Sequence, residues 1–560
     1  MFNQVLTVVN GIIWHNVVIL LLLAVGILFT IWSKFGQVRA LSHGFKIIRG
    51  DFDSEKGDGA ISHFQALSAA LSATVGVGNI GGTALAISMG GPGALFWMWI
   101  VGLLGMALKT VEVTVTMLYR KKEGDQVLGG PMWVVDQGLK DIFPSFRSVA
   151  KFVAGLFCIT LLIATFTGGL FFQAWNAANI TQQFFGIPGW IVGLILAVIV
   201  GSVILGGIQR IGTVAGKIVP FMCTIYMLAA LYAIGVHSAK IPSLIQEIFS
   251  SAFSSSSAQG AFLGGTFGAI FSIGMQRAFF SSEAGQGSSP IAHAAVKTDE
   301  PVREGVVAGL EPFIDTIVVC TLTGLVILLS GVWNRAADYS FESQPIFEQV
   351  AAADSDSKTW RLGDCQLPER SDREWVDADR IFVIATIQSE EQPLQQQVTG
   401  VISIEDGKRN VEWQEVASET QPVVQSEGFF IAYDGAALAA AAFNRSGDGL
   451  GKWLVTVATW LFGISTMISW SYYGEQGVTY LFGRHSVLIY RLLFCLAIFL
   501  SCVGLVQSRT ELTNLSNLGT GVMLWVNIPI TLLFAPVAMR HYHAYFAKSE
   551  ESLDDERHSA

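Results

Sequence analysis

Long uninterrupted apolar runs are the feature that most constrains how this chain can fold. Several reach the roughly 20 residues that a helix needs to cross about 30 Å of hydrocarbon. Examples lie at 16–35, 187–205 and 485–505. Of the 560 residues, 51% are hydrophobic and only 14% are charged, a balance that a water-soluble domain could not hide from water. We therefore expect an all-α protein that crosses the bilayer many times.

Hydrophobic windows predict about eleven membrane spans. The predicted spans are 16–35, 60–88, 93–119, 149–177, 187–206, 212–236, 261–287, 304–333, 451–482, 485–506 and 514–539. The first is interpreted as a span and not as a cleavable signal, because no basic residue precedes it. The six cysteines suggest neither a disulfide framework nor a CxxC metal pattern.

Basic residues gather in the loops that follow the first and third predicted spans. They are Lys34, Arg39, Lys46, Arg49, Lys56, Arg120, Lys121, Lys122, Lys140 and Arg147. The positive-inside rule places both loops in the cytoplasm. Counting spans from there predicts an N-terminus outside the cell and a cytoplasmic C-terminus.

A polar insertion at 334–446 separates the eighth and ninth predicted spans, on the extracytoplasmic side. It holds 20 Asp and Glu against 9 Lys and Arg, whereas the formal charge of the whole chain is −10. Alternating apolar residues at 380–387 and 398–404 predict a small β-rich domain, while 354–357 and 395–397 are predicted as loops. This domain could either solubilise the outer face or attract a partner or a cation.

Glycines interrupt the second predicted span. The segment 71–93, LSATVGVGNIGGTALAISMGGPG, places Thr74 and Asn79 among glycines such as Gly76 and Gly78. Unpaired backbone groups cost several kcal/mol each in lipid, so a break of this kind persists only inside protein or beside a solvated cavity. Packing of small residues without a site is the alternative explanation.

A second glycine-rich break, FSIGMQRAFFSSEAGQGSSP at 271–290, lies five spans after the first. Five is an odd number, so two five-helix units enter the membrane from opposite faces, as in transporters with inverted repeats and a midplane site. The predicted organisation is an extra helix and basic loop (1–59), a first repeat (60–236), a second repeat (261–333 and 447–540), the insertion (334–446) and a cytoplasmic tail (541–560).

Ionisable residues inside predicted spans are costly, so they indicate function or pairing. Glu311 and Asp315 are four residues apart on one helical face. For Asp315, a structural hydrogen-bond role and a role as cation or proton relay both remain open. Lys109 and Glu112 are predicted to form a structural ion pair near the inner interface, and a transport role is the alternative.

Hydroxyl side chains recur in the ninth span, where Ser465, Thr466 and Ser469 precede Trp470. Hydroxyl oxygens presented together can complete the shell of a hard cation. Hydrogen bonding between helices is the alternative role.

Four segments together resemble the alanine/glycine:cation symporter family, also called sodium:alanine symporters. This family belongs to the amino acid–polyamine–cation group with the leucine-transporter-like fold. The segments are VGVGNIGGTALAISMGGPGALFWMWIVGLLGMALK (75–109), AFFSSEAGQGSSPIAHAAVKTDEPVREG (278–305), FIDTIVVCTLTGLVILLSG (313–331) and STMISWSYYGEQGVTYLFG (465–483). The insertion is longer than the connection typical of the family, and about 340–430 carries no family motif.

The resemblance implies eleven spans with a five-plus-five inverted repeat, and inward movement of alanine or glycine coupled to Na⁺. By motif position, the implied substrate-binding residues are Gly78, Asn79, Gln173, Phe280, Ser281, Glu283 and Trp470. The implied Na⁺ site comprises Thr74, Gly76, Ser465 and Thr466. A bacterial inner membrane is the implied location.

Two rival functions remain open. One is proton-coupled symport through Asp315 or Glu283, and the other is a non-transporting sensor whose outer domain binds a ligand. An enzyme is not expected, because no phosphate loop, nucleophile elbow or cluster of metal-binding histidines is recognisable. No nucleic-acid partner is expected, and the oligomeric state is left open.

Overall fold

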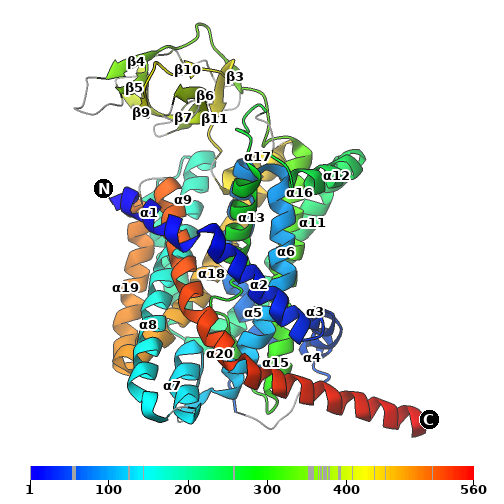
Figure 1. The fold of residues 1–560 in the computed structure, drawn as a ribbon. Helices are drawn as coiled ribbons and strands as arrows, with labels where there is room; N and C mark the ends of the chain where they lie inside the picture. Colours follow the sequence, from blue (N-terminus) through cyan, green and yellow to red (C-terminus); the bar gives the residue numbers. More distant parts are fainter. Residues whose placement is uncertain are drawn as a thin grey trace.

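The computed structural model consists of a helical bundle with a small β domain at one end (Figure 1). It describes residues 2–559 except 53–57, 124–125, 143, 256–258, 351–357, 364, 366, 368, 370–374, 376–378, 389–392, 406–407, 434, 448 and 507–508. Within these described residues, eight helices are long and apolar enough to cross a membrane, and the shorter apolar helix α10 (Gly189–Ile204) lies among them. The chain is therefore a multi-pass membrane protein.

Each predicted span coincides with a helical segment. Before the insertion these are α2 (Asn16–Trp32), α5 (His63–Thr74), η2 (Gly78–Gly82), α6 (Thr83–Leu118), α8 (Arg147–Phe166), η4 (Thr167–Phe171), α9 (Phe172–Phe185), α10, α11 (Gly207–Val236), α13 (Phe267–Ser282), α15 (Pro301–Ala308), η6 (Phe313–Cys320) and α16 (Thr321–Ser330). After it come α18 (Leu450–Phe482), α19 (Val487–Leu500), η8 (Ser501–Leu505) and α20 (Arg509–Ser559). The 541–560 tail continues α20 as far as Ser559, and this helix extends past the bundle (Figure 1).

Several helices were not among the predicted spans. They are α1 (Phe2–Ile13), α3 (Gly36–Arg39), η1 (Ala40–Gly44), α4 (Phe45–Arg49), α7 (Pro131–Ile142), η3 (Pro144–Phe146), η5 (Ser238–Lys240), α12 (Ile241–Ser251), α14 (Pro290–His293), α17 (Ala436–Asn444) and η7 (Arg484–Ser486). Most are shorter than the bilayer requires, so a search for long apolar windows passes over them.

The first predicted break is present. Helix α5 begins with a capping box in which Ser62 and Gln65 exchange side-chain and backbone hydrogen bonds. It ends at Thr74, and regular helix resumes only after η2, in α6. Within α6, non-helical dihedrals at Gly91, next to Pro92, produce a kink. The kink falls between the predicted spans 60–88 and 93–119, so these spans are separate helical segments.

The second predicted break follows α13. Glu283 ends this helix with φ 51° and ψ 15°, the left-handed region, and the helix that resumes, α14, has only four residues. A non-glycine residue rarely adopts this conformation. Its neighbours must therefore hold Glu283 in place, and such outliers gather at functional sites.

Strands occupy most of the described part of the insertion. They are β3 (Tyr339–Ser340), β4 (Phe347–Val350), β5 (Lys358–Leu362), β6 (Arg380–Gln388), β7 (Pro393–Glu405), β8 (Lys408–Trp413), β9 (Val416–Ser418), β10 (Val423–Val424) and β11 (Gly428–Ile431). One sheet has the order β3-β11-β6-β7-β8, with β10 also on β6, and a second has the order β4-β5-β9. A separate hairpin, β1 (Lys121–Glu123) with β2 (Gln126–Leu128), lies in the bundle.

The loop predicted at 395–397 is wrong. These three glutamines lie in β7, where they pair antiparallel with Ile384, Ala385 and Thr386 of β6. The hydrogen bonds between paired strands come from the backbone. A run of polar residues can therefore continue a strand when the residues on either side of the run already pair with the neighbouring strand. The other predicted loop, 354–357, lies outside the described residues.

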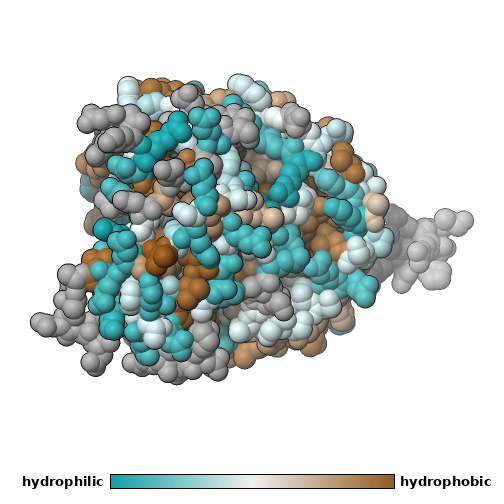
Figure 2. Space-filling view, turned by 90° about the horizontal axis from the view of Figure 1, so that it is seen from above, coloured by the Kyte–Doolittle hydropathy of each residue, from teal (hydrophilic) through white to brown (hydrophobic). Residues whose placement is uncertain are grey.

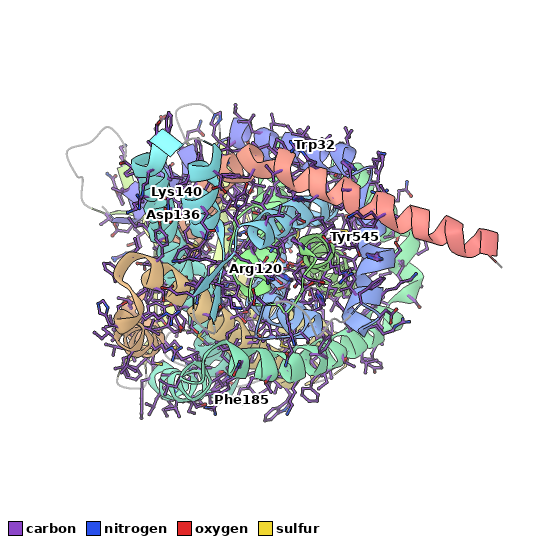
Figure 3. The ribbon with its side chains drawn as sticks, turned by 90° about the horizontal axis from the view of Figure 1, so that it is seen from below. Trp32, Arg120, Asp136, Lys140, Phe185 and Tyr545 are labelled. Atoms are coloured by element: carbon purple, nitrogen blue, oxygen red, sulfur yellow. The ribbon has the colours of Figure 1, made fainter. Side chains whose placement is uncertain are left out.

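The two ends of the bundle differ in the residues that they expose. Seen from the β-domain end, the surface is mostly hydrophilic (Figure 2). At the opposite end, Arg120 lies near the centre of the face and Lys140 lies beside Asp136 (Figure 3), with 2.9 Å between Lys140 Nζ and Asp136 Oδ1. The described part of the basic loop after the third predicted span is thus at the end away from the β domain.

Candidate transport site between the two helix breaks

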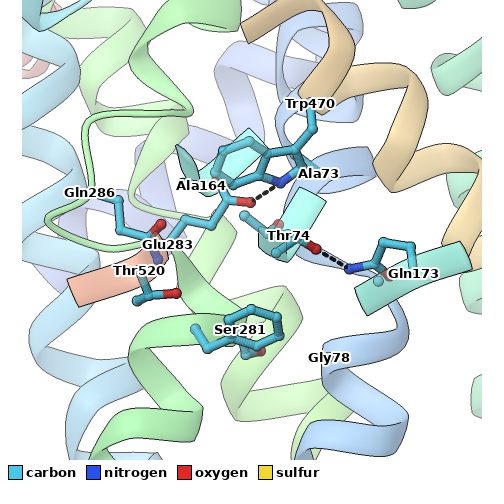
Figure 4. Close-up of a pocket in the computed structure, with 13 residues that line it drawn as sticks. Ala73, Thr74, Gly78, Ala164, Gln173, Ser281, Glu283, Gln286, Trp470 and Thr520 are labelled. Atoms are coloured by element: carbon cyan, nitrogen blue, oxygen red, sulfur yellow. Dashed lines mark hydrogen bonds between the residues drawn. The ribbon is translucent and has the colours of Figure 1, made fainter. Parts of the chain in front are cut away.

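A small cavity lies where the two broken segments meet (Figure 4). It is lined by Ala73, Thr74, Gly76, Gly78, Ala164, Gly168, Gln173, Phe280, Ser281, Glu283, Gln286, Trp470 and Thr520. Its volume is about 20 Å³, room for about one water molecule. The lining must therefore move outward to admit even a small amino acid.

Side-chain amides cap the first break. Asn79 Oδ1 accepts a hydrogen bond from the Gly76 N–H at 2.8 Å, and Gln173 Oε1 accepts one from the Val77 N–H at 3.0 Å. Two backbone donors freed by the break are thereby satisfied inside the membrane. The Gln173 amide also donates to the Gly168 carbonyl at 3.0 Å, which ties α9 to η4.

Asn79 also connects the first break to the second. Its amide nitrogen donates to Ser281 Oγ at 3.0 Å and to the Asp315 carbonyl at 3.1 Å. The residue is fully buried and is absent from the cavity lining. In this conformation both ends of the Asn79 amide are bound to protein.

A carboxylate from the second break faces the cavity. Glu283 Oε1 accepts a hydrogen bond from Trp470 Nε1 at 2.9 Å (Figure 4), and Oε2 accepts one from the Ser288 hydroxyl. The side chain is 3% exposed. These two hydrogen bonds hold the Glu283 carboxylate at the wall of the cavity. A cationic group of a ligand in the cavity could pair with this carboxylate.

Two aromatic side chains form walls of the cavity. The Phe280 ring packs edge-on against Phe172, with 4.9 Å between ring centroids, and Trp470 packs against Tyr473 at 5.5 Å. Gly169 lies directly against Trp470, because a Cβ added to this glycine would be 2.4 Å from Trp470 Cγ.

Replacing Gly169 by alanine is therefore expected to lower uptake of a transported amino acid by about tenfold, since overpacking costs about 1–3 kcal/mol and the indole must shift. Gly268→Ala is the matched control, because a Cβ there meets nothing within 4 Å. Uptake into proteoliposomes measures both. Equal uptake by the two variants would mean that the position of Trp470 is unimportant.

Hydroxyls of α18 lie beside the first break. A Cβ added to Gly76 would be 2.5 Å from Thr466 Oγ1. In the described part of the chain, neither Thr466 Oγ1 nor Ser469 Oγ has a hydrogen-bond partner, and both side chains are buried. Ser465 differs, because its hydroxyl donates to the Phe462 carbonyl at 2.9 Å. Buried hydroxyls without partners call for an explanation, and a bound cation supplies one.

Asp315 does not line the cavity but lies next to Asn79, which donates to its backbone carbonyl. Its carboxylate accepts hydrogen bonds from the Thr316 hydroxyl at 2.7 Å and from the Ser281 hydroxyl at 3.4 Å, and the side chain is fully buried. Glu311 meets other partners, because the π-helical segment η6 begins between the two acids. The predicted pair of acids thus serves two different clusters.

Charged side chains anchor the breaks on the side away from the β domain. Glu304 contacts both His63 and His293, and His293 Nε2 lies 2.7 Å from Glu311 Oε1. Lys109 Nζ lies 3.1 Å from Glu311 Oε2, and it also donates to Ser289. We name His63, Lys109, His293, Glu304 and Glu311 the anchor cluster.

The predicted ion pair of Lys109 with Glu112 is wrong. Lys109 pairs with Glu311, whereas Glu112 accepts hydrogen bonds from the Gly285 N–H at 3.0 Å and from Asn527. Sequence spacing within α6 suggested a local pair, but packing of α6 against the second break and α15 supplies closer partners to both side chains.

The cavity brings together most residues implied by the resemblance. Of the implied substrate-binding residues, the cavity is lined by Gly78, Gln173, Phe280, Ser281, Glu283 and Trp470, and Asn79 is absent from the lining. Of the implied Na⁺-site residues, it is lined by Thr74 and Gly76 and not by Ser465 or Thr466. The sequence did not single out Gln286 or Thr520. Gln286 lies within the second-break motif, so that motif was an available signal, whereas nothing in the pattern around Thr520 marks it.

Comparison with known proteins gives one consistent family. The model of the sodium:alanine symporter family matches residues 1–354 and 416–559. The unmatched stretch falls inside the insertion.

Two relatives match nearly the whole chain. The sodium/alanine symporter AgcS of Methanococcus maripaludis is 31% identical, over 97% of each chain. A putative sodium/proton-dependent alanine carrier protein, YrbD of Bacillus subtilis, is also 31% identical, over 97% of this chain and 93% of its own. Among solved structures, MhsT in complex with L-phenylalanine matches 85% of this chain at 12% identity, with a TM-score of 0.47. This chain belongs to the sodium:alanine symporter family and is a transporter, not an enzyme.

Proposed function

We propose that the protein carries a small amino acid, alanine or glycine, into the cell by symport with Na⁺. The observation that carries this proposal is the small cavity between the two breaks, with the Glu283 carboxylate at its wall and, beside it, buried hydroxyls that have no partner among the described residues. The relative from Methanococcus maripaludis is named a sodium/alanine symporter, which supports alanine as the amino acid and Na⁺ as the coupled ion.

Recognition of the amino acid rests on opposite charges at close range. The ammonium group meets the Glu283 carboxylate, and the substrate carboxylate meets backbone N–H groups of the first break when the capping amides of Asn79 and Gln173 yield them. Phe280 and Trp470 limit the space for a substrate side chain, which favours alanine, glycine or serine over leucine.

Sodium binds, in this proposal, next to the first break. Thr466 supplies a hydroxyl oxygen, and backbone carbonyls near Thr74 and Gly76 supply others. Bound Na⁺ orders the break, so Na⁺ raises the affinity for the amino acid and the amino acid raises the affinity for Na⁺ equally.

Transport follows when the two five-helix repeats rock against each other around the cavity. The β-domain end faces outward with the N-terminus, and the basic end with the C-terminus faces the cytoplasm. The expected location is the cell membrane, in a bacterium the inner membrane.

Uptake of labelled alanine into proteoliposomes tests this proposal directly. An inward Na⁺ gradient at fixed pH is expected to drive accumulation, and Thr466→Val is expected to raise the Na⁺ concentration for half-maximal uptake at least about tenfold, because a charge-assisted contact is worth about 1.5–3 kcal/mol.

The control for Thr466→Val is Thr456→Val on the same helix, whose hydroxyl is bound to the Lys452 carbonyl. It is expected to leave the Na⁺ dependence unchanged. Accumulation without any response to Na⁺ would contradict the proposal.

Proton coupling is the rival that a specific observation favours. Asp315 is fully buried and shares Ser281 with the substrate cavity, and one relative is described as sodium/proton-dependent. Uptake driven by a pH gradient without Na⁺, and lost in Asp315→Asn, would establish it. Membership in a family of symporters does not favour the third hypothesis, a non-transporting sensor.

A further inference from the structure

A second cavity, of about 380 Å³, lies at the β-domain end of the bundle. The end of α9, the segment after α16, the end of α17 and the start of α18 form its walls. Three cationic side chains line it, Arg335, Arg445 and Lys452, against one described acid, Asp338. It is distinct from the transport cavity, with which it shares no lining residue. We name it the basic cavity.

One of the three cations is already balanced. Arg335 Nε lies 3.1 Å from each carboxylate oxygen of Asp338, and the other guanidinium nitrogens donate to the Val332 and Ile431 carbonyls. Arg335 and Asp338 therefore form a pair without net charge in the wall of the cavity. The bond from Arg335 to the Ile431 carbonyl in β11 also holds the β domain to the bundle.

Among the described residues, the other two cations have no acidic partner. In the part of the chain that the structure describes, neither Arg445 nor Lys452 has a carboxylate within ion-pair distance; Arg445 donates to the Ser330 carbonyl at 3.0 Å, and Lys452 Nζ lies 4.9 Å from the Phe185 ring centroid. Partial burial and the neighbouring Arg335 lower the pKa of Arg445. The described lining of the basic cavity is thus short of negative charge, which an anionic ligand would supply.

The basic cavity continues into an apolar groove on the surface of α18. Gly449 lines both, and Leu450, Trp453, Leu454 and Val457 line the groove. Trp453 and Val457 are 64% and 51% exposed, and Trp453 packs edge-on against Phe185 at 4.6 Å.

The first turns of α18 are suited to the depth of lipid headgroups. Helix α18 has 33 residues, about 50 Å at 1.5 Å per residue, so it is longer than about 30 Å of hydrocarbon and has turns that lie outside it. Lysine and tryptophan are the side chains favoured at this depth.

We propose that this joined pocket binds an anionic phospholipid of the leaflet on the β-domain side. The headgroup phosphate lies in the basic cavity between Arg445 and Lys452, and one acyl chain lies along the groove past Trp453. Charge complementarity and the continuity of the groove with the basic cavity favour a lipid over a soluble anion, because a soluble anion has no acyl chain to lie in the groove.

Native mass spectrometry of the full chain, with dioleoylphosphatidylglycerol competing against dioleoylphosphatidylcholine, tests the proposal. The wild type is expected to retain phosphatidylglycerol at least about tenfold more strongly, and Lys452→Gln and Arg445→Gln are each expected to reduce that preference at least about threefold. Lys240→Gln is the matched control, because Lys240 is exposed at the end of η5 and lines neither the basic cavity nor the groove; this variant should keep the full preference.

Soluble competitors separate a lipid from a free anion. Inorganic phosphate and glycerol 1-phosphate carry the phosphate without acyl chains and are expected not to displace the lipid at tenfold excess. Displacement by either, or equal retention of the two lipids by the wild type, would overturn the proposal. Thermal unfolding of each variant identifies any loss of lipid caused by misfolding. Trp453→Ala keeps both cations and alters only the groove, so it is expected to weaken binding of both lipids.

Discussion

Glu283→Gln is expected to weaken alanine binding at least about 30-fold. The carboxylate is held at the cavity wall by Trp470 and Ser288 and is almost completely buried. Removing one member of a buried, hydrogen-bonded charge pair costs about 2–5 kcal/mol, and 2 kcal/mol corresponds to about 30-fold in affinity. Uptake in proteoliposomes and alanine binding to the purified protein in Na⁺ both measure the effect.

Two variants show that the effect belongs to the charge of Glu283. Ser288→Ala removes a hydrogen bond from the carboxylate but keeps its charge, so a smaller loss is expected. Glu247→Gln removes an exposed glutamate from α12 and should leave affinity unchanged. If Glu283→Gln binds alanine as tightly as the wild type, Glu283 does not contact the ammonium group.

Glu304→Ala is expected to lower the free energy of unfolding by about 3–5 kcal/mol, the usual cost of removing one member of a buried charged cluster. Glu304 is fully buried and bridges His63 at the start of α5 to His293 after the second break. Its loss leaves the Nδ1 atoms of two buried imidazoles, His63 and His293, without their carboxylate partner. Thermal unfolding of the purified protein, and its yield in a mild detergent, measure the change.

A surface ion pair at the same end is the control for Glu304→Ala. Lys122 contacts Asp58, and both side chains are more than half exposed, so Asp58→Asn should leave stability unchanged. Glu304→Gln is expected to fall between the two, because an amide can still accept one hydrogen bond. A stability of Glu304→Ala equal to that of Asp58→Asn would show that the anchor cluster does not hold the two breaks together.

The membrane class, the long apolar helices and the two breaks were all predictable from sequence. Apolar length reports directly on the bilayer, because a helix must present about 20 apolar residues to cross it. Glycines beside polar residues within such a run mark where the helix is interrupted. Both signals are local, so the breaks near Gly76 and Glu283 needed no knowledge of their neighbours.

The partners of the polar residues were not predictable in the same way. Resemblance to the family indicated Glu283 and Trp470, but only the fold shows that they are hydrogen-bonded to each other across 187 positions of sequence. The sequence also left Gln286 and Thr520 unmarked, although both reach the cavity.

Sequence was sufficient to show that this chain spans a membrane, where its helices break and to which family of transporters it belongs. The fold was needed to show that Lys109 pairs with Glu311 and not with Glu112, that Asn79 and Gln173 cap the first break, and that Arg445 and Lys452 have no acidic partner among the described residues. The physical reason is distance: hydrophobic length and helix breaks arise within one segment, whereas a buried charge pairs with the nearest opposite charge that packing brings to it.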